Sequence, residues 1–247
     1  MPCGARLTGS ATTAMSKPVA IVAAMRSELG PLLRGASKRE CNGVEVYELP
    51  SALVAIGGIG HAAGRRAAEV IVGEANPGIL ISAGLAGALS PSLKAGDIVR
   101  AREVVDEASG ERHETIGGDA VLVTAVRVTG SQGKRRLATA YSASAVDMEA
   151  AAVAGIAKQH GICFAVVKAI SDDLAFAMPP VNGFVTPQGQ FRAGAFAAHV
   201  AVRPRWWLPT VRLALNSRRA SRNLAVALEH LIEQHAQAIP GENKVRL

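Results

Sequence analysis

Nearly continuous apolar runs at 19–24, 79–83 and 162–170 constrain the fold most. Such runs are typical of β-strands that are buried on both faces of a sheet. Further strands are predicted at 44–48, 52–56 and 98–105, and one or two strands within 119–128. Helices are predicted at 61–73, 145–160 and 209–234. Strands that alternate with helices predict an α/β fold, here a three-layer single domain with a central mixed β-sheet flanked by helices.

The ends of the chain and its cysteines bound the class of protein. Residues 1–17 are small, polar and unpatterned, and we expect a disordered leader there and a folded domain over 18–240. The leader lacks the apolar run of a secretory signal, and no stretch reaches the roughly 18 apolar residues of a spanning helix. Three cysteines without a Cys-x-x-Cys pair argue against a disulfide framework or a zinc site. We therefore predict a cytoplasmic protein without a metal.

The formal net charge of +7 comes from one C-terminal segment. Between Asp173 and Glu229 there are seven arginines and no Asp, Glu or Lys, which leaves 20 basic and 20 acidic residues elsewhere. A protein that binds nucleic acid normally spreads its basic residues along a face of the main body. Because the main body is neutral here, no nucleic-acid partner is predicted.

Unusual chemistry follows four of the predicted strands, at 25–28, 57–60, 84–87 and 171–173. In open α/β sheets, ligands bind at the carboxyl ends of the strands. The glycines and carboxylates of these four segments are therefore predicted to converge on one site.

The glycine-rich turn at 57–60 also fits a dinucleotide-binding fingerprint, since Gly58, Gly60 and Ala63 follow a strand and precede a helix. That fingerprint needs an acidic residue about 20 positions later to hold a ribose hydroxyl. The next strand instead ends in Ser82, Ala83 and Gly84. The turn remains a candidate for cradling a small anion or sugar hydroxyls through its backbone N–H groups.

Two acidic segments can be interpreted either as structural or as part of a site. Asp147 and Glu149 open an Ala-rich helix pattern, where acids commonly cap the helix and complement its dipole. Asp172 and Asp173 follow a buried strand, and two adjacent carboxylates there are less easily explained as a turn.

Six motifs occur in order over 18–174, namely Ala23–Leu29, Gly58–Gly60, Gly84–Gly87, Leu93–Val99, Val146–Ala150 and Val166–Asp172. Taken together, they resemble the nucleoside phosphorylase/nucleosidase superfamily, in particular methylthioadenosine/S-adenosylhomocysteine nucleosidases. The segment after 174 contains Pro179-Pro180, Phe184, Phe191-Arg192 and Arg203–Trp207. It resembles the hopanoid-associated phosphorylases of that superfamily, which are thought to remove adenine from adenosylhopane.

The resemblance implies a phosphorylase-like fold that cleaves the N-glycosidic bond of a purine (adenine-type) nucleoside. It makes Asp172 the acid at purine N7, Glu149 the carboxylate that holds the ribose hydroxyls, and Glu28 the residue that activates water. Such roles suit a reaction with an oxocarbenium-like transition state and a poor leaving group. Further substrate-binding residues implied by the resemblance are Gly58, Gly60, Leu85, Ala86, Gly87, Met148 and Ser171.

No cofactor is implied, but the nucleophile stays open. Inorganic phosphate is an alternative co-substrate, for which Arg26, Arg65 and Arg66 are candidate ligands. A non-catalytic nucleoside-binding module is a second alternative. Leu85 and Lys168 depart from the family pattern, which usually has a small hydroxyl residue and an arginine there, and no aromatic residue occurs in 106–140 to stack on the base. The superfamily also implies a homo-oligomer.

The C-terminal helix pattern carries a further prediction of peripheral membrane contact through residues 203–222. An apolar stripe and a separate arginine arc run along this helix, just after Trp206 and Trp207. Basic residues beside paired Trp suit an anionic lipid interface. The alternative is that the stripe packs on the domain core and the arginines are solvated. The stripe comprises Leu213, Ala220, Leu224, Ala227, Leu228 and Leu231.

Overall fold

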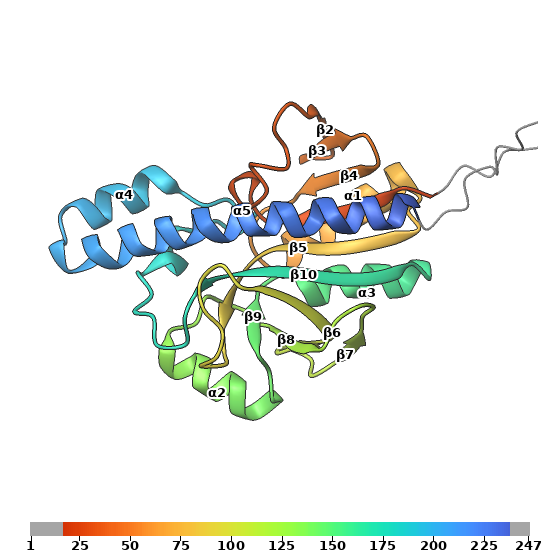
Figure 1. The fold of residues 1–247 in the computed structure, drawn as a ribbon. Helices are drawn as coiled ribbons and strands as arrows, with labels where there is room; N and C mark the ends of the chain where they lie inside the picture. The colour runs from red at the N-terminus through yellow and green to blue at the C-terminus, as the bar shows by residue number, and fades with distance from the viewer. Residues whose placement is uncertain (1–16, 238–247) are drawn as a thin grey trace, which may run out of the picture.

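A computed structural model describes residues 17–237 (Figure 1). Apart from its last residue, the leader predicted over 1–17 lies outside the described residues. The strands are β1 (Val19–Ala23), β2 (Ser37–Cys41), β3 (Val44–Leu49), β4 (Ala52–Ile56), β5 (Ile79–Ala88), β6 (Ile98–Asp106), β7 (Arg112–Glu114), β8 (Ala120–Thr124), β9 (Ala145–Asp147) and β10 (Cys163–Asp172). The helices are α1 (His61–Ala75), α2 (Ser131–Tyr141), α3 (Ala150–His160), α4 (Ala193–Ala201) and α5 (Trp207–Gln237), with 3-10 turns η1 (Arg26–Glu28), η2 (Val181–Phe184) and η3 (Pro204–Trp206).

The strands form one mixed sheet whose order is β10-β6-β8-β9-β5-β1-β4-β3-β2, with β7 paired to β6. Strand β10 also pairs in parallel with β5, so β5, β9, β8, β6 and β10 close on one another in a ring. Strands β1, β5 and β10 run parallel, so their carboxyl ends lie at the same edge. This arrangement brings the polar residues that follow each strand together.

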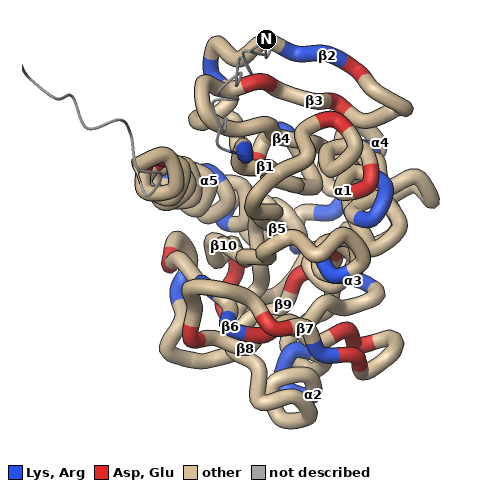
Figure 2. Tube along the Cα trace, turned by 90° about the vertical axis from the view of Figure 1, so that its right-hand side faces the viewer, with Lys and Arg blue, Asp and Glu red and all other residues tan. Residues whose placement is uncertain are grey.

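Helices cover both faces of the sheet, which confirms the predicted three-layer α/β domain. Helices α1 and α3 pack on one face, and α5 packs against β5 and β10 on the other (Figure 2). Ala220, Leu224 and Leu228 of α5 are fully buried in the core. The second half of the predicted apolar stripe therefore packs on the domain rather than on a lipid surface.

The predicted strands and most of the helices are confirmed, and 119–128 contains one strand, β8. The helix predicted over 145–160 is wrong at its start, because Ala145–Asp147 forms β9 between β8 and β5. This segment pairs with a strand on each side, and Asp147 caps α3, which begins only at Ala150.

Besides β9, two strands and two α-helices were not predicted, namely β2, β7, α2 and α4. Strand β2 is an exposed edge strand and β7 has three residues, so neither shows an apolar pattern. Helix α4 and the first half of α5 project beyond the sheet (Figure 1). Within residues 17–237, no helix is both long and apolar enough to cross a membrane.

Candidate active site

A cavity of about 330 Å³ opens where the carboxyl ends of β1, β5 and β10 meet β9 and the start of α3. Eight of the ten sequence-predicted site residues line it. They are Glu28, Leu85, Ala86, Gly87, Met148, Glu149, Ser171 and Asp172. The sequence prediction that these segments converge on one site is thus realised in the geometry.

Gly58 and Gly60 are the two predicted residues that do not line the cavity, although Ile59 between them does. Both glycines have a left-handed φ of about +100°, which favours glycine. The Gly60 N–H donates a 2.7 Å hydrogen bond to Glu149 Oε1. Through this bond the turn positions a carboxyl group of the site, and a direct contact of Gly58 or Gly60 with substrate stays a prediction.

Glu28 lies at the end of η1, with its side chain buried beneath the cavity. Its Oε2 accepts hydrogen bonds from the backbone N–H groups of Ala24 (3.2 Å) and Met25 (3.1 Å), and its Oε1 accepts one from Leu85 (3.4 Å). A Cβ at Gly84 would lie only 3.0 Å from Oε2, so glycine is needed for this close approach. Burial raises the pKa of Glu28 above its ordinary value, against the opposing charge of Lys168 and the backbone N–H groups.

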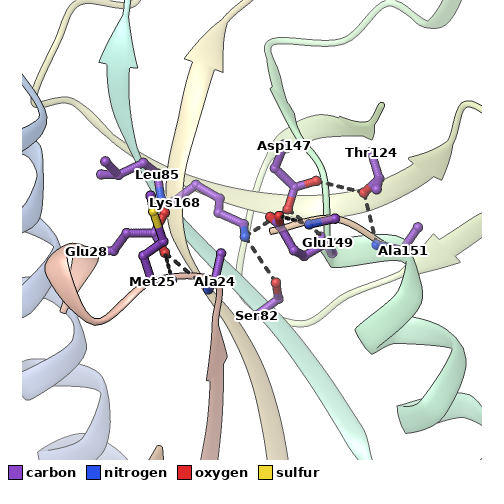
Figure 3. A network of polar contacts seen from close by, with 12 residues as sticks. Ala24, Met25, Glu28, Ser82, Leu85, Thr124, Asp147, Glu149, Ala151 and Lys168 are labelled. Carbon is purple, nitrogen blue, oxygen red and sulfur yellow. Dashed lines mark hydrogen bonds and ion pairs between the residues drawn. The ribbon is translucent and has the colours of Figure 1, made fainter. Parts of the chain in front are cut away.

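Lys168 lies among the carboxyl groups and was interpreted from sequence only as a departure from the family pattern (Figure 3). Its Nζ is 2.8 Å from Asp147 Oδ2 and donates a 3.1 Å hydrogen bond to Ser82 Oγ. Burial acts to lower the pKa of Lys168, but the charges of Asp147 and Glu149 outweigh burial and raise it. Lys168 therefore supplies a fixed positive charge to this acidic site.

Asp147 takes the capping role that the sequence had offered for both acids of this segment. Its Oδ2 accepts a 2.9 Å hydrogen bond from the Ala150 N–H at the start of α3, and its Oδ1 accepts one from Thr124 Oγ1 at 2.7 Å. Glu149 is the N-cap residue of α3 but makes no capping bond with its side chain. Its carboxyl group is turned instead toward Gly60 and the cavity.

Burial, the charge of Asp147 and, to a smaller extent, that of Glu28 raise the pKa of Glu149 to about 8, against the opposing charge of Lys168. Three buried carboxyl groups thus share one ammonium group. This arrangement disfavours the ionised forms of Glu28 and Glu149. Positive charge that develops on a bound ligand would favour their ionised forms.

Asp172 ends β10 at an irregularity in the strand pairing. Ile170 pairs with Ala86 and Asp172 with the next residue, Gly87, so Ser171 is an extra residue. Neighbouring residues of a regular strand point to opposite faces, whereas a bulge re-aims a side chain. Here both Ser171 and Asp172 line the cavity, and Ser171 Oγ donates a 2.6 Å hydrogen bond to Asp172 Oδ1.

Lys134 of α2 is a site residue that the sequence analysis missed. It is buried, lines the cavity and forms an ion pair with Asp172 Oδ2. The available signal was helical spacing, because Lys134 shares a buried helix face with Leu137, whereas Arg135 and Arg136 are exposed.

An apolar wall from the chain after Asp173 completes the cavity. Phe191 and Phe196 pack with ring centroids 5.4 Å apart, and Phe196 packs edge-to-face on Phe184. Phe191 and Phe196 give the cavity an aromatic surface, although 106–140 contains no aromatic residue. The apolar side chains that line the cavity from this region are Met178, Val181, Val185, Phe191, Phe196 and Leu213.

The three arginines considered as phosphate ligands lie away from the cavity lining. Arg26 stacks over the Tyr47 ring, Arg65 pairs with Glu69 on α1, and Arg66 donates to the Gly57 carbonyl oxygen. Arg127 is the arginine among the described residues that lines the cavity, and it is exposed. The predicted phosphate ligands therefore do not meet Glu28.

Replacement of Glu149 by glutamine is expected to stabilise the protein at alkaline pH. The pKa of Glu149 is raised in the folded state, so the folded state holds a proton that the unfolded chain loses, and stability falls as pH rises from about 4.5 to about 8. Glutamine is neutral throughout and still accepts the Gly60 bond. Thermal melts from pH 5 to 9 should show that the stability gained in Glu149→Gln grows with pH. Each pKa unit corresponds to about 1.36 kcal/mol, so the gain should reach a few kcal/mol.

The matched control is Glu114→Gln, which replaces an exposed carboxylate on β7. An advantage of Glu149→Gln that is equal at pH 5 and pH 9, or no advantage at all, would contradict the raised pKa.

Comparison with known proteins places this geometry in a family. The model of the phosphorylase superfamily matches residues 18–127 and 120–186, which together exceed half of the chain. A 5′-methylthioadenosine/S-adenosylhomocysteine nucleosidase from Helicobacter pylori superposes with a TM-score of 0.67 at 18% identity, over 89% of this chain and 99% of that chain.

Two further solved structures give the same result. The corresponding nucleosidase from Neisseria meningitidis, in complex with methylthio-immucillin-A, has a TM-score of 0.67 at 20% identity over 88% of this chain and 99% of that chain. The native futalosine hydrolase of Helicobacter pylori has a TM-score of 0.67 at 18% identity over 89% and 99%. At these identities the likeness establishes the fold, and it confirms the predicted phosphorylase-like architecture.

Proposed function

Because this chain belongs to the phosphorylase superfamily of enzymes, we propose that it hydrolyses the N-glycosidic bond of a purine (adenine-type) nucleoside. The observation that carries the proposal is the convergence of the buried side chains of Glu28, Glu149 and Asp172 on one cavity. Their separate segments lie 23 or more positions apart in sequence, so helix capping at each one does not account for their meeting.

In the proposed reaction, the three carboxyl groups act on different atoms. The C1′–N9 bond of the nucleoside breaks, and its electron pair leaves with the purine, which takes a proton at N7 from Asp172. Glu28 accepts a proton from water as the water oxygen forms the new bond to C1′. Glu149 accepts hydrogen bonds from the ribose hydroxyls, and its negative charge stabilises the oxocarbenium-like transition state. Asp172 then regains its proton and Glu28 loses one, so the proton balance is restored through solvent.

Met148 lies in the same cavity and is proposed to pack against the sugar. Backbone atoms at Leu85, Ala86 and Gly87, together with Ser171, line the base and ribose positions in this proposal. Water is favoured over phosphate as the nucleophile, because Glu28 is present and the candidate arginines pair elsewhere. The reaction then needs no cofactor, and inorganic phosphate stays the alternative co-substrate.

The apolar wall supports a substrate with a bulky apolar 5′ substituent. Phe191, Phe196 and Leu213 line the same cavity as the three carboxyl groups, so a ribose held at Glu149 would have apolar surface within the same enclosure. Adenosylhopane, expected from the hopanoid-associated resemblance, is one nucleoside of this kind. An apolar substituent would gain roughly 25 cal/mol for each Å² removed from water.

The experiment that tests this function measures free adenine released from 5′-alkylthioadenosines of increasing chain length, with and without inorganic phosphate. Hydrolysis gives adenine and free sugar in both conditions, whereas phosphorolysis gives sugar 1-phosphate only when phosphate is present. Rising kcat/KM with chain length supports the apolar 5′ group. A folded protein that binds these nucleosides and releases no adenine would instead be a binding module.

We also propose that the projecting part of α5 contacts an anionic membrane surface from the cytoplasmic side. Trp207, Leu208, Val211 and Leu215 expose more than half of their surface, although they are large apolar side chains. Arginines flank them, while the other face of the same helix lines the cavity. The occupant is assigned by charge, since each basic residue near an anionic bilayer contributes about 1 kcal/mol. These arginines are Arg203, Arg205 and Arg212.

Co-sedimentation with anionic vesicles should therefore show binding at low salt that weakens at high salt, and neutral vesicles should bind little. Leu208→Ser should release the protein, whereas Ile116→Ser, which replaces another exposed apolar residue in the loop after β7, should not. Protein that stays in the supernatant at low salt would contradict membrane contact. The superfamily implies a homo-oligomer. If that oligomer dissociates when Leu208 is replaced by serine, this face contacts a second copy of the chain instead.

A further inference from the structure

The ion pair between Lys134 and Asp172 is buried at the base of the cavity. The side chains of Lys134 and Asp172 expose only 2% and 4% of their surface. A lysine is rarely buried unless its charge is paired, because desolvation of an ammonium group is costly. The site described so far uses Asp172 but gives no function to Lys134.

The contacts of Lys134 Nζ account for all three of its N–H donors. Nζ donates to Asp172 Oδ2, to the Asp172 carbonyl oxygen at 3.3 Å and to the Asp173 carbonyl oxygen at 2.8 Å. The lysine thus holds both the side chain of Asp172 and the backbone that follows β10. With its donors engaged, it is unavailable as a proton donor to a ligand without breaking one of these bonds.

Each carboxylate oxygen of Asp172 has one partner, Lys134 at Oδ2 and Ser171 at Oδ1. The plane of the Asp172 carboxyl group is therefore fixed from two sides, and in its protonated form the group can still donate one hydrogen bond to a ligand. Gly87 is part of this arrangement, since a Cβ there would lie 3.0 Å from Lys134 Cε and 3.2 Å from Asp172 Oδ2. A glycine at 87 leaves room for the pair beside the strand.

The other buried cation of the site does not substitute for Lys134. Lys168 is engaged by Asp147 and Ser82, on the ribose side of the cavity. Helix α2 carries Lys134, and the loop that precedes α2 contributes Arg127, Val128 and Thr129 to the cavity lining. One residue thus links this loop and helix to the end of β10.

We infer that Lys134 is a positioning residue for the reaction, which holds the Asp172 carboxyl group in the orientation that meets the leaving base. The inference rests on the proposed function, because it requires Asp172 to act at the purine. A displacement of about 1 Å from the productive geometry lowers a rate by about 10²-fold. Loss of the lysine should therefore slow base release through Asp172 alone.

A double-mutant cycle tests this role, with adenine release from a 5′-alkylthioadenosine as the assay. Lys134→Met should lower kcat about 10²-fold in the otherwise unchanged enzyme, with a smaller change in KM, and should have little further effect in the Asp172→Asn background. Lys134→Arg, which keeps a cationic donor, should retain more activity than Lys134→Met. Arg135→Met, an exposed position on the same helix, is the matched control and should retain full activity.

The outcomes separate the inference from the function on which it rests. If Lys134→Met lowers kcat equally in the presence and absence of Asp172, or does not lower it at all, the positioning role is overturned. Activity of the wild-type enzyme would still uphold the proposed function. Wild-type protein that releases no adenine would overturn both. If Lys134→Met does not fold, as judged by circular dichroism, Gly87→Ala provides the second variant, because its methyl group crowds the Lys134–Asp172 pair without removing either residue. Full kcat in Gly87→Ala would then overturn the inference.

Discussion

Replacement of Asp172 by asparagine is expected to lower the rate of purine release by about 10²–10⁴-fold. An amide has the size of the carboxyl group but cannot deliver a proton to N7, so the purine would leave as an unstabilised anion. Asparagine can still accept a hydrogen bond from Lys134 and meet Ser171, but it removes the charge that pairs with the buried Lys134. The fold should therefore be retained with a lower melting temperature. The measurement is kcat for adenine release from a 5′-alkylthioadenosine, together with a thermal melt.

A substrate with a good leaving group provides the chemical control for this variant. The nitrophenolate of p-nitrophenyl riboside departs without a proton, so Asp172→Asn should cleave it at close to the rate of the unmodified enzyme. Asp119→Asn, an exposed aspartate, is the matched control for the substitution itself. If Asp172→Asn keeps most of its activity on the purine nucleoside, the acid assignment is wrong. If the activity on both substrates falls equally, Asp172 has a structural role.

The second large effect is expected for Glu28→Gln, which should abolish nearly all hydrolysis. Glutamine cannot accept a proton from the attacking water. Three backbone N–H groups, of Ala24, Met25 and Leu85, donate to the two oxygens of Glu28. Glutamine has only one side-chain oxygen, so at least one of these N–H groups loses its acceptor. A stability loss of about 1–3 kcal/mol is therefore expected alongside the loss of activity. The measurement is adenine release with and without phosphate, compared with a thermal melt.

Glu28→Gln also distinguishes the two nucleophiles. A phosphorylase that uses ionised phosphate should keep much of its phosphate-dependent activity in this variant, whereas a hydrolase should not. Glu48→Gln, an exposed glutamate on β3, should behave like the unmodified protein in both assays. Substantial phosphate-independent hydrolysis by Glu28→Gln would contradict the assignment of Glu28 as the base.

The sequence predicted the sheet and most of the site for one physical reason. Buried parallel strands are continuous apolar runs, and the residues that follow them meet at one edge of the sheet. Glu28, Leu85 and Asp172 each follow or end such a run, so their convergence could be expected without coordinates. Glu149 was found through the family resemblance rather than through this rule.

The remaining parts of the site depend on contacts between distant elements. Lys134 and Lys168 become site residues only because each is buried against a carboxylate from another segment, which local composition does not reveal. The short β9 pairs with β5 and β8, and its three residues are too few to show a strand pattern in the sequence. The apolar wall required α4, which was not predicted, to bring Phe196 against Phe191 and the cavity.

The central claim is that one cavity holds a purine nucleoside with its base at Asp172 and its ribose at Glu149. A crystal structure with a non-cleavable 5′-alkylthioadenosine analogue tests it most directly. We predict purine N7 within hydrogen-bond distance of Asp172, the ribose hydroxyls within that distance of Glu149, and the 5′ group against Phe191 and Phe196. An analogue bound with its base away from Asp172, or with its ribose away from Glu149, would contradict the account.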